Sequence, residues 1–487
     1  MKFITTLKEQ ISSIDINKKE LFSSVLFLSI VYVIAFISIF RANYNYIDDI
    51  RRAVRGDTIN EAYSRHISEF LSYFLHTTDG RLTDISPLPQ LIACLFLALA
   101  GFIMVKVMCK KPTKYILLAT LPIGLSPYFL GCLVWKFDAP YMALSILVSI
   151  VPFLFMHKNR WLYASVSVIS LLIMTMTYQA SSGVFIMMTL YFFFRTILSK
   201  SDSTKHAFVF LGISCLSYGI ALGLFRFCFL QEVTTYASTN LSTNHNIFTL
   251  FWNNINKYYT YVCTDWNVIW KITALIIIVT FYVKNIVLSK LNKTIAFFVT
   301  TLFAALLAGS VFGVYALLEK PLFSPRAMLG VGILLAILGV DICCSLKKIF
   351  SFPVMVLGWC FFVFALAYGN CLADQKRYRE FRTEMLVYDL SQLMLTKNEK
   401  PYKLIVRGGF GLSGVAENTA HNNPITKRLI NSGLMHVSLS HYHNFQNFLA
   451  EWYSKIPQKE EEAIPVVFDS FYHTIKMNDE VVVVILK

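Results

Sequence analysis

Long apolar runs separated by short polar segments make up the first three quarters of the chain. A helix needs about 20 apolar residues to cross the hydrocarbon core of a bilayer, and eleven runs come near this length. They cover residues 21–40, 87–107, 115–134, 140–156, 161–178, 183–199, 207–228, 267–288, 294–317, 327–345 and 352–371. The pattern predicts a polytopic α-helical membrane protein with about 11 transmembrane helices. The runs within 115–156 and 161–199, which flank short connections, are the weakest and could contain re-entrant or tilted pieces.

The polar connections form two alternating sets. One set is short and almost free of acids, and it holds Lys18, Lys19, Lys106, Lys110, Lys111, Lys114, Lys158, Arg160, Arg195, Lys200, Lys205, Lys284, Lys290, Lys293, Lys347 and Lys348. By the positive-inside rule these connections and the N-terminus are cytoplasmic. The other set, with loops 41–86 and 229–266, then faces the periplasm of a bacterial inner membrane. The cytoplasmic connections are too short to build a site, so function is expected on the periplasmic face.

The last part of the chain, residues 373–487, has a different pattern. A helical segment over 376–399 is followed by three stretches of high β propensity at 404–406, 466–468 and 481–485. We expect a small α/β domain in the periplasm, following a membrane domain over residues 1–372. The histidines of this segment do not have the spacing of metal ligands.

Composition agrees with a membrane protein and excludes other classes. Only 15% of the 487 residues are charged, against about 25% in a soluble protein. The net charge of +15 would suggest nucleic acid in a soluble protein, but here it reflects basic residues retained on the cytoplasmic side. No nucleic-acid partner is expected, whereas membrane lipids are. The cysteines, among them Cys94, Cys215, Cys343, Cys344 and Cys360, lie mostly in apolar runs and are interpreted as small buried hydrophobic residues, not as metal ligands.

Two adjacent carboxylates, Asp48 and Asp49, follow the first apolar run, and Arg51, Arg52 and Arg55 come directly after them. The low dielectric of the bilayer interface shifts carboxylate pKa values, and arginine binds phosphate through two parallel hydrogen bonds. The cluster indicates chemistry on a lipid-linked phosphate. The alternative is a solvated loop whose charges pair with one another.

The same loop is expected to form a helix over residues 48–56, with Asp48 paired to Arg52 and with Ile47, Ile50 and Val54 against lipid. Further charged residues of the loop could support the site or the acceptor: Arg65, Glu69, Arg81 and Asp84.

Two other candidate places lie on the same face. Lys136 and Asp138 occupy a very short turn after Trp135, where a simple turn needs neither charge. Arg326 follows a proline at the start of a span, well placed to bind a phosphate. The alternatives are an interfacial anchor for Trp135 and a snorkelling cation for Arg326. Loop 229–266 is rich in Asn and aromatic residues, which is typical of sugar sites and of interfacial belts alike.

Several stretches taken together resemble a known family. They are residues 46–52, 65–71, 82–90, 135–144 and 325–329, including Thr-Asp-Ile-Ser-Pro-Leu and Phe-Asp-Ala-Pro-Tyr-Met-Ala-Leu. They resemble the type II membrane glucosyltransferases, the serotype-converting O-antigen glucosyltransferases of enteric bacteria and their phages. The resemblance reaches to about residue 345 and implies a GT-C-like catalytic domain.

The resemblance implies transfer of glucose from undecaprenyl-phosphate glucose to a sugar hydroxyl of lipopolysaccharide O-antigen. A polyprenyl-phosphate glucose synthase and a flippase would supply this donor. Asp48 or Asp49 would be the general base of an inverting displacement, and Asp138 would orient the acceptor or an arginine. Donor phosphate would be bound by Arg326 and one of the arginines after Asp49, that is Arg51, Arg52 or Arg55, with Lys136 nearby. No cofactor is required, although the three aspartates could hold a divalent metal.

Two other functions fit part of the pattern. A flippase or transporter of a polyprenyl-linked sugar would explain the spans and the arginines, but predicts charges inside the spans and related halves. The sequence shows few charges inside the spans, such as Lys271 and Asp341 near span ends, and no repeat. An O-antigen polymerase or ligase would share the substrate class and the membrane face, and its product would distinguish it.

Overall fold

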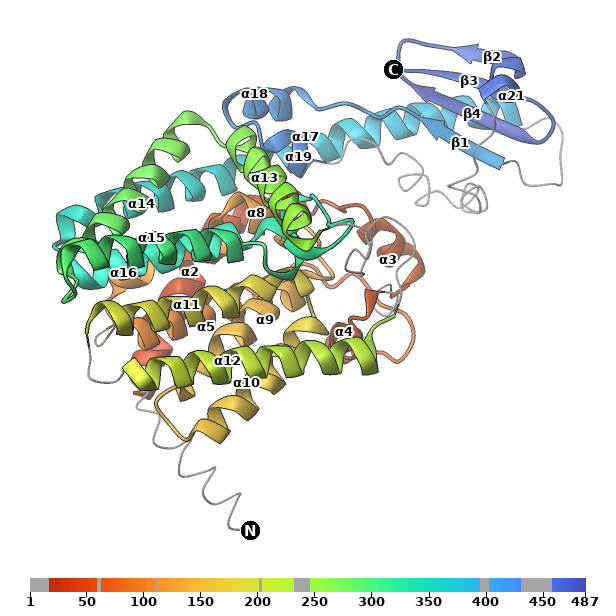
Figure 1. Ribbon diagram of the computed structural model, residues 1–487. Coiled ribbons are helices and arrows are strands. Elements are labelled where there is room, and N and C mark those ends of the chain that lie inside the picture. The colour runs from red at the N-terminus through yellow and green to blue at the C-terminus, as the bar shows by residue number, and fades with distance from the viewer. Residues whose placement is uncertain are drawn as a thin grey trace.

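The apolar segments form one bundle of helices in the computed structural model (Figure 1). The structure describes residues 17–58, 63–109, 112–200, 204–231, 246–394, 403–430 and 458–487. The bundle is built from α2 (Lys18–Ala42), α5 (Leu88–Met108), α6 (Lys114–Leu118), α7 (Pro122–Leu125), α8 (Pro127–Leu133), α9 (Ala139–Ile150), η2 (Val151–Phe155), α10 (Arg160–Thr175), α11 (Ser182–Leu198), α12 (Thr204–Leu224), η4 (Phe225–Phe229), α14 (Val268–Leu288), α15 (Lys293–Ser310), η6 (Pro325–Met328), α16 (Gly330–Ser345), η7 (Lys348–Ser351) and α17 (Phe352–Met394). Shorter elements connect them: α3 (Asp49–Arg55), α4 (His66–His76), η3 (Gln179–Ser181), α13 (Ile247–Asp265) and η5 (Gly313–Leu317).

The helices confirm a polytopic helical membrane protein but not the expected count. Eight helices of the described residues are long and apolar enough to cross a bilayer, or nine if one bent pair is a single span. The pair is 114–125 and 127–133, whose axes differ by 62°. Pro127 cannot donate a backbone hydrogen bond to continue the helix, and the Ser126 side chain instead accepts from Phe129 N and starts α8. The helices over 139–155 and 160–175 are shorter than a span.

Close backbone contacts hold the centre of the bundle together. α16 is the most enclosed of the candidate spans and packs against α7. A Cβ at Gly332 would come within 2.3 Å of the Pro122 carbonyl oxygen, so only glycine allows this approach. At Gly369 of α17, a Cβ would lie 2.3 Å from Ser38 Oγ of α2. These two glycines allow α16 to lie close to α7 and α17 to lie close to α2.

The last helix, α17, joins the bundle to the C-terminal segment. Its 43 residues span roughly 65 Å at 1.5 Å per residue, about twice the thickness of a bilayer core. The helix therefore continues past residue 372 without a break and leaves the bundle at the end where α3 and α4 lie (Figure 1). Its outer half carries the sheet.

The C-terminal sheet has four strands in the order β1-β4-β3-β2. These are β1 (Lys403–Arg407), β2 (Val466–Asp469), β3 (His473–Met477) and β4 (Val481–Leu486), and α18 (Gly414–Asn422), α19 (Thr426–Leu429) and α21 (Gln458–Ala463) accompany them. β1 pairs in parallel with β4, and the other pairs are antiparallel. The expected strands at 404–406, 466–468 and 481–485 are present, and β3 was not predicted. Leu386 and Leu390 of α17 cover one face of the sheet.

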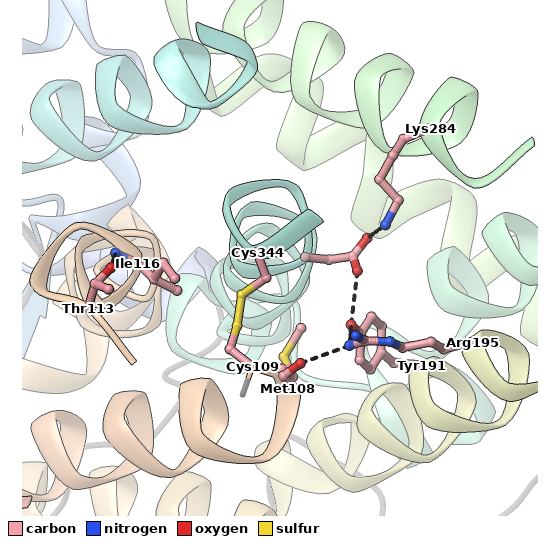
Figure 2. Close-up of a disulfide and its surroundings, with 9 residues drawn as sticks. Met108, Cys109, Thr113, Ile116, Tyr191, Arg195, Lys284 and Cys344 are labelled. Atoms are coloured by element: carbon pink, nitrogen blue, oxygen red, sulfur yellow. Dashed lines mark hydrogen bonds and ion pairs between the residues drawn. A yellow bond between two sulfur atoms is a disulfide. The ribbon is translucent and has the colours of Figure 1, made fainter. Parts of the chain in front are cut away.

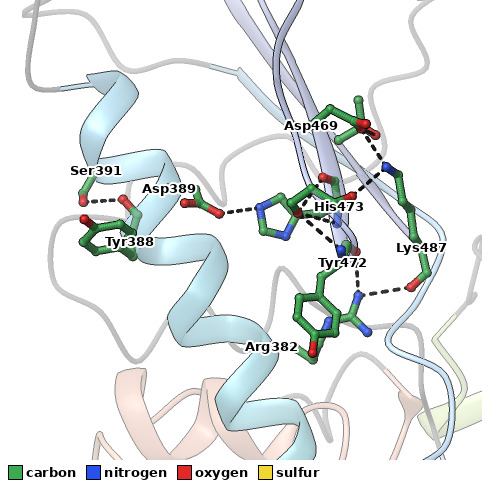
Figure 3. Close-up of polar contacts among 10 residues, drawn as sticks. Arg382, Tyr388, Asp389, Ser391, Asp469, Tyr472, His473 and Lys487 are labelled. Atoms are coloured by element: carbon green, nitrogen blue, oxygen red, sulfur yellow. Dashed lines mark hydrogen bonds and ion pairs between the residues drawn. The ribbon is translucent and has the colours of Figure 1, made fainter.

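Arg382 attaches the sheet to α17 (Figure 3). This buried side chain donates through Nη2 to the carbonyl oxygens of Tyr472 at 2.7 Å and Lys487 at 3.1 Å. About two turns further along α17, the buried His473 of β3 bonds through Nε2 to Asp389 Oδ2 at 2.9 Å. Burial outweighs the attraction of Asp389 and lowers the pKa of His473. The histidine is thus part of the packing between helix and sheet.

A disulfide joins Cys109, directly after the end of α5, to Cys344 in the last turn of α16, 235 residues further along the chain (Figure 2). The expectation that Cys344 is simply a small buried hydrophobic residue is therefore wrong, because it is half-buried and disulfide-bonded. Cys215 is exposed on α12, so the expectation also fails there, whereas Cys94 is buried and free. Sequence distance hides the pairing, because the two cysteines meet only when α5 and α16 pack together.

Candidate active site

The C-terminal end of α2, helix α3 and the turn between α8 and α9 meet around Asp49. Asn43, in the left-handed conformation with φ of 41°, ends α2, and Tyr46 begins the turn into α3. The second turn, from Val134 to Asp138, closes through a hydrogen bond from Ala139 N to Trp135 O at 2.9 Å. Two segments nearly 90 residues apart in the sequence therefore present their charges to one another.

Asp49 is completely buried between these two segments. Its Oδ2 accepts hydrogen bonds from Tyr46 N at 3.1 Å and from Lys136 N at 3.2 Å, while Oδ1 is buried without a partner. Burial outweighs the attraction of Arg52 and Lys136 and raises the pKa of Asp49 from 3.8 to about 7. A carboxyl group with this pKa exchanges its proton near neutral pH.

Arg52 and Asp138 form a buried ion pair. Nη1 of Arg52 lies 2.7 Å from Asp138 Oδ1, and both side chains are less than a tenth exposed. Burial alone would raise the pKa of Asp138, but the guanidinium of Arg52, with Arg65 and Arg326 further away, holds it below its usual value. Arg52 also lies over the ring of Phe137, 5.9 Å from its centroid. Asp138 is therefore a charged carboxylate among three arginines.

Lys136 ties the turn to the rest of the site. Its ammonium group donates to Asn43 Oδ1 at 2.9 Å and to Asp84 Oδ2 at 2.6 Å, and its side chain is 2% exposed. Burial works against ionisation of Asp84, but hydrogen bonds from Lys136 and Ser86 hold the pKa of Asp84 below its usual value. The lysine thus fixes the ends of α2, loop 41–86 and the turn relative to one another.

Asp48 differs from its neighbour because it is half-buried. It precedes the first residue of α3, and its side chain does not cap the helix. Burial raises the pKa of Asp48, while Arg52 and Arg326 lower it and Asp138 raises it further. Its carboxylate therefore borders the same arginines as Asp138 but reaches solvent.

Arg326 and Arg65 reach the cluster from two other elements. The guanidinium of Arg326, on η6, stacks 4.1 Å from the centroid of the Trp135 ring. That of Arg65 lies 5.0 Å from the Tyr178 ring centroid and 3.5 Å, through Nε, from Gln179 Oε1. Stacking on aromatic rings holds an arginine in place and keeps its charge. Both side chains are half-buried, so they lie at the edge of the buried charges.

The remaining predicted residues lie further out or have other partners. Arg51 pairs with Asp57 at 2.6 Å through Nε, and Arg55 is exposed. Arg81 is exposed too, and its backbone lies against Gly56 at the end of α3. Glu69 is half-buried on α4, where its Oε2 is enclosed without a hydrogen bond.

Two expectations about α3 are wrong. Ile50 was expected to lie on lipid but is 1% exposed and packed inside the protein. Arg52 was expected to pair with Asp48 one turn earlier but forms its ion pair with Asp138. The apolar face of α3 therefore covers the bundle, which draws Asp49 and Arg52 inward with Ile50.

The sequence reasoning missed Asn43 and His76. An Asn directly after a long apolar run is typical of a helix end in the left-handed conformation, and that would have indicated Asn43. His76 stacks on Phe137 with ring centroids 5.7 Å apart, and its Nδ1 lies 2.8 Å from Ser72 O. Burial lowers the pKa of His76, which favours the neutral ring. Among the described residues, no group of three or more His, Cys, Asp or Glu side chains could share a metal ion.

The fold and the site define a polytopic membrane protein with buried acids and arginines gathered at one end of its helices. A family model described as "Glucosyl transferase GtrII" matches residues 37–337, well over half of the chain. The chain therefore belongs to the GtrII glucosyl transferase family and is a membrane glucosyltransferase, which confirms the resemblance. The match includes every residue of the site described above. No curated protein and no solved structure matches the chain.

Proposed function

We propose that the protein transfers glucose from undecaprenyl-phosphate glucose to a hydroxyl group of an O-antigen sugar on the periplasmic face of a bacterial inner membrane. Membership of the GtrII family indicates a glucosyltransferase of O-antigen modification. The observation that carries the proposal further is the convergence of Asp48, Asp138, Arg52, Arg65 and Arg326 at one end of the bundle. A lipid-linked donor can present its phosphate at that level of the membrane.

Asp48 is the proposed general base. It is the half-buried member of the acidic pair, whereas Asp49 is sealed and already accepts two backbone hydrogen bonds. A pKa raised by burial makes Asp48 a stronger base while it remains able to lose its proton. Asp48 takes the proton of the acceptor hydroxyl as its oxygen attacks the anomeric carbon of the donor. The bond from that carbon to the phosphate oxygen breaks, and the configuration inverts.

Arg326 and Arg65 are the proposed ligands of the leaving phosphate. Both are half-buried and stacked on aromatic rings, so they can contact a phosphate without a large rearrangement. Arg52 is held by Asp138 in the interior and contributes mainly through its charge. Because the two guanidinium groups are already held in place, they can stabilise the negative charge that develops on the leaving phosphate.

The buried charges form the frame of the site. Asp49 joins the backbones of Tyr46 and Lys136, and Arg52 joins α3 to the turn at Asp138. We assign Asp49, Asp138 and Lys136 to positioning because all three side chains are buried and bound to protein groups. Arg51, Arg55 and Arg81 lie at the surface and could meet the acceptor or the lipid headgroups.

The test is the substitution Asp48→Asn assayed with polyprenyl-phosphate glucose and an O-antigen acceptor. Loss of a general base costs about 10²–10⁴-fold in rate, so kcat should fall in that range while donor binding is retained. Asp57→Asn is the matched control, because Asp57 lies in the same segment and pairs with the partly exposed Arg51. Full activity of the Asp48 variant at normal expression would contradict the assignment. Mass and linkage analysis of the product then identifies the sugar and its anomeric configuration.

A further inference from the structure

A cavity of about 540 Å³ opens at the end of the bundle away from the candidate active site. It lies between the ends of α5 and η2, the last turns of α11 and the first turns of α12. Four of its lining residues can carry positive charge, namely Lys106, His157, Arg195 and His206, and the described lining contains no acid. Apolar side chains, including Phe192 and Phe210, form the rest of the wall.

The cavity and the active site lie at opposite ends of the same helix. Gln90, near the start of α5, donates to Leu133 O at 3.1 Å beside the active-site turn. Lys106 lies 16 residues further along α5, which corresponds to roughly 24 Å at 1.5 Å per residue. The thickness of a bilayer core is about 30 Å. The cavity therefore opens near the second membrane surface, where lipid headgroups are found.

Arg195 is held in place at the edge of this cavity (Figure 2). Its Nη1 donates to Met108 O at 2.9 Å and to the Tyr191 hydroxyl at 2.5 Å. Tyr191 in turn donates to Asp341 Oδ1 at 2.9 Å, and Asp341 already forms a buried ion pair with Lys284. Because Lys284 compensates Asp341, the positive charge of Arg195 is available to a ligand.

Lys106 supplies the second fixed charge. Its ammonium group lies 3.4 Å from Glu20 Oε2, a long contact in which the lysine side chain is 20% exposed. A phosphate between Lys106 and Arg195 would meet one compact cation and one planar guanidinium. The aromatic wall beside them would contact glycerol and the first acyl carbons. A free inorganic anion would make no favourable contact with that apolar surface.

We propose that this cavity binds the headgroup of an anionic phospholipid, with its phosphate between Arg195 and Lys106. Basic pockets between transmembrane helices near the membrane surface are known to bind such headgroups. The ligand is distinct from donor and acceptor, and the proposal does not depend on the assignment of Asp48 or of the donor. It also accounts for a fixed arginine whose counter-charge is otherwise missing from the described residues around it.

Retention of phosphatidylglycerol and phosphatidylcholine by the purified full chain, measured by native mass spectrometry, tests the site. The wild-type protein should retain phosphatidylglycerol preferentially. Each basic residue near a membrane surface contributes about fivefold in anionic lipid affinity, so Lys106→Gln with Arg195→Gln should lower retention at least tenfold. Lys347→Gln with Lys348→Gln is the matched control, since both lysines lie outside the cavity and their loss should leave this preference in place.

Two further measurements, on Arg195→Lys and on competition by inorganic phosphate, separate the alternatives. Arg195→Lys keeps the charge and should retain an intermediate preference, which shows that the variants fold and that charge matters. Equal retention of phosphatidylglycerol by wild type and the double variant would overturn the proposal. Competition by inorganic phosphate as effective as that by short-chain phosphatidylglycerol would also overturn it, because the cavity would then be a site for free anions.

Discussion

Replacement of Asp49 by Asn tests the buried carboxyl group at the centre of the candidate active site. Asp49 Oδ2 accepts from two backbone N–H groups, at 3.1 and 3.2 Å, and an amide oxygen can accept the same bonds. Oδ1 is buried without a partner and would become the amide nitrogen. The variant therefore keeps the shape and the hydrogen bonds of protonated Asp49 but cannot ionise.

The pKa shift of Asp49 sets the sign and the size of the stability difference between the variant and the wild type. The pKa of Asp49 rises from 3.8 to about 7 on folding, mainly because of burial. Between these values the unfolded chain has lost the proton while the folded protein keeps it, so the contribution of Asp49 to stability decreases as pH rises. The shift of roughly three pKa units corresponds to about 4 kcal/mol. Asn does not ionise, so the variant does not lose stability in this way as pH rises. Its free energy of unfolding relative to that of the wild type should therefore increase by up to about 4 kcal/mol between pH 4 and pH 8.

Thermal unfolding of both proteins in one detergent, measured across this pH range, is the assay. At pH 4 the two unfolding temperatures should lie close together, and at pH 8 the variant should be the more stable. Asp57→Asn provides the control, because Asp57 is partly exposed and paired with Arg51, and it should not reproduce the pH-dependent gain. A stability difference for the Asp49 variant that stays constant or shrinks as pH rises would refute the reasoning.

Two further predictions concern the arginines. Arg52→Met leaves Asp138 buried without its ion-pair partner, which costs about 3–5 kcal/mol in the free energy of unfolding. Adding Asp138→Leu should recover part of it, and strictly additive effects would show that the pair is not coupled. Arg326→Lys loses the planar contact with Trp135 at 4.1 Å and the bidentate geometry, so the KM for the lipid donor should rise about tenfold. An unchanged KM would remove Arg326 from the phosphate site.

The sequence located the charged residues of the site but not their pairings. Asp48, Asp49, Lys136, Asp138 and Arg326 were all assigned to one face from the alternation of basic and polar connections. Helix periodicity then suggested a contact within α3, whereas the ion pair of Arg52 is made with a turn 86 residues away. Periodicity identifies an apolar face but does not say whether lipid or protein covers it. Ile50 is covered by protein, so helix α3 is oriented with its apolar face toward the bundle and not toward lipid.

The elements themselves were predicted with uneven success, for physical reasons. The apolar runs marked the helices, and 115–156 was among the stretches expected to allow re-entrant or tilted pieces. The run alone does not show that the helix breaks at Ser126 and Pro127 with a bend of 62°. Strand β3 was not predicted because His473 and Lys476 interrupt its apolar pattern. The turn that follows it did carry a local signal in Asn478, whose side chain accepts a hydrogen bond from Val481 N at 2.8 Å. The disulfide of Cys109 and Cys344 depends on helix packing that no local pattern encodes.

The C-terminal segment contributes to the candidate site through η6, the element that carries Arg326. Leu429 of α19 lies against Gly131, where a Cβ would come within 3.2 Å of its Cδ2 and 3.3 Å of Arg326 N. Next to it, Arg428 pairs with the buried Asp265 at 2.5 Å and donates to Phe323 O at 3.1 Å. The ion pair holds α19 to the end of α13, and the hydrogen bond to Phe323 O holds it to the segment that leads into η6. The last part of the chain, which carries no recognisable motif, thus supports the backbone from which Arg326 reaches the site.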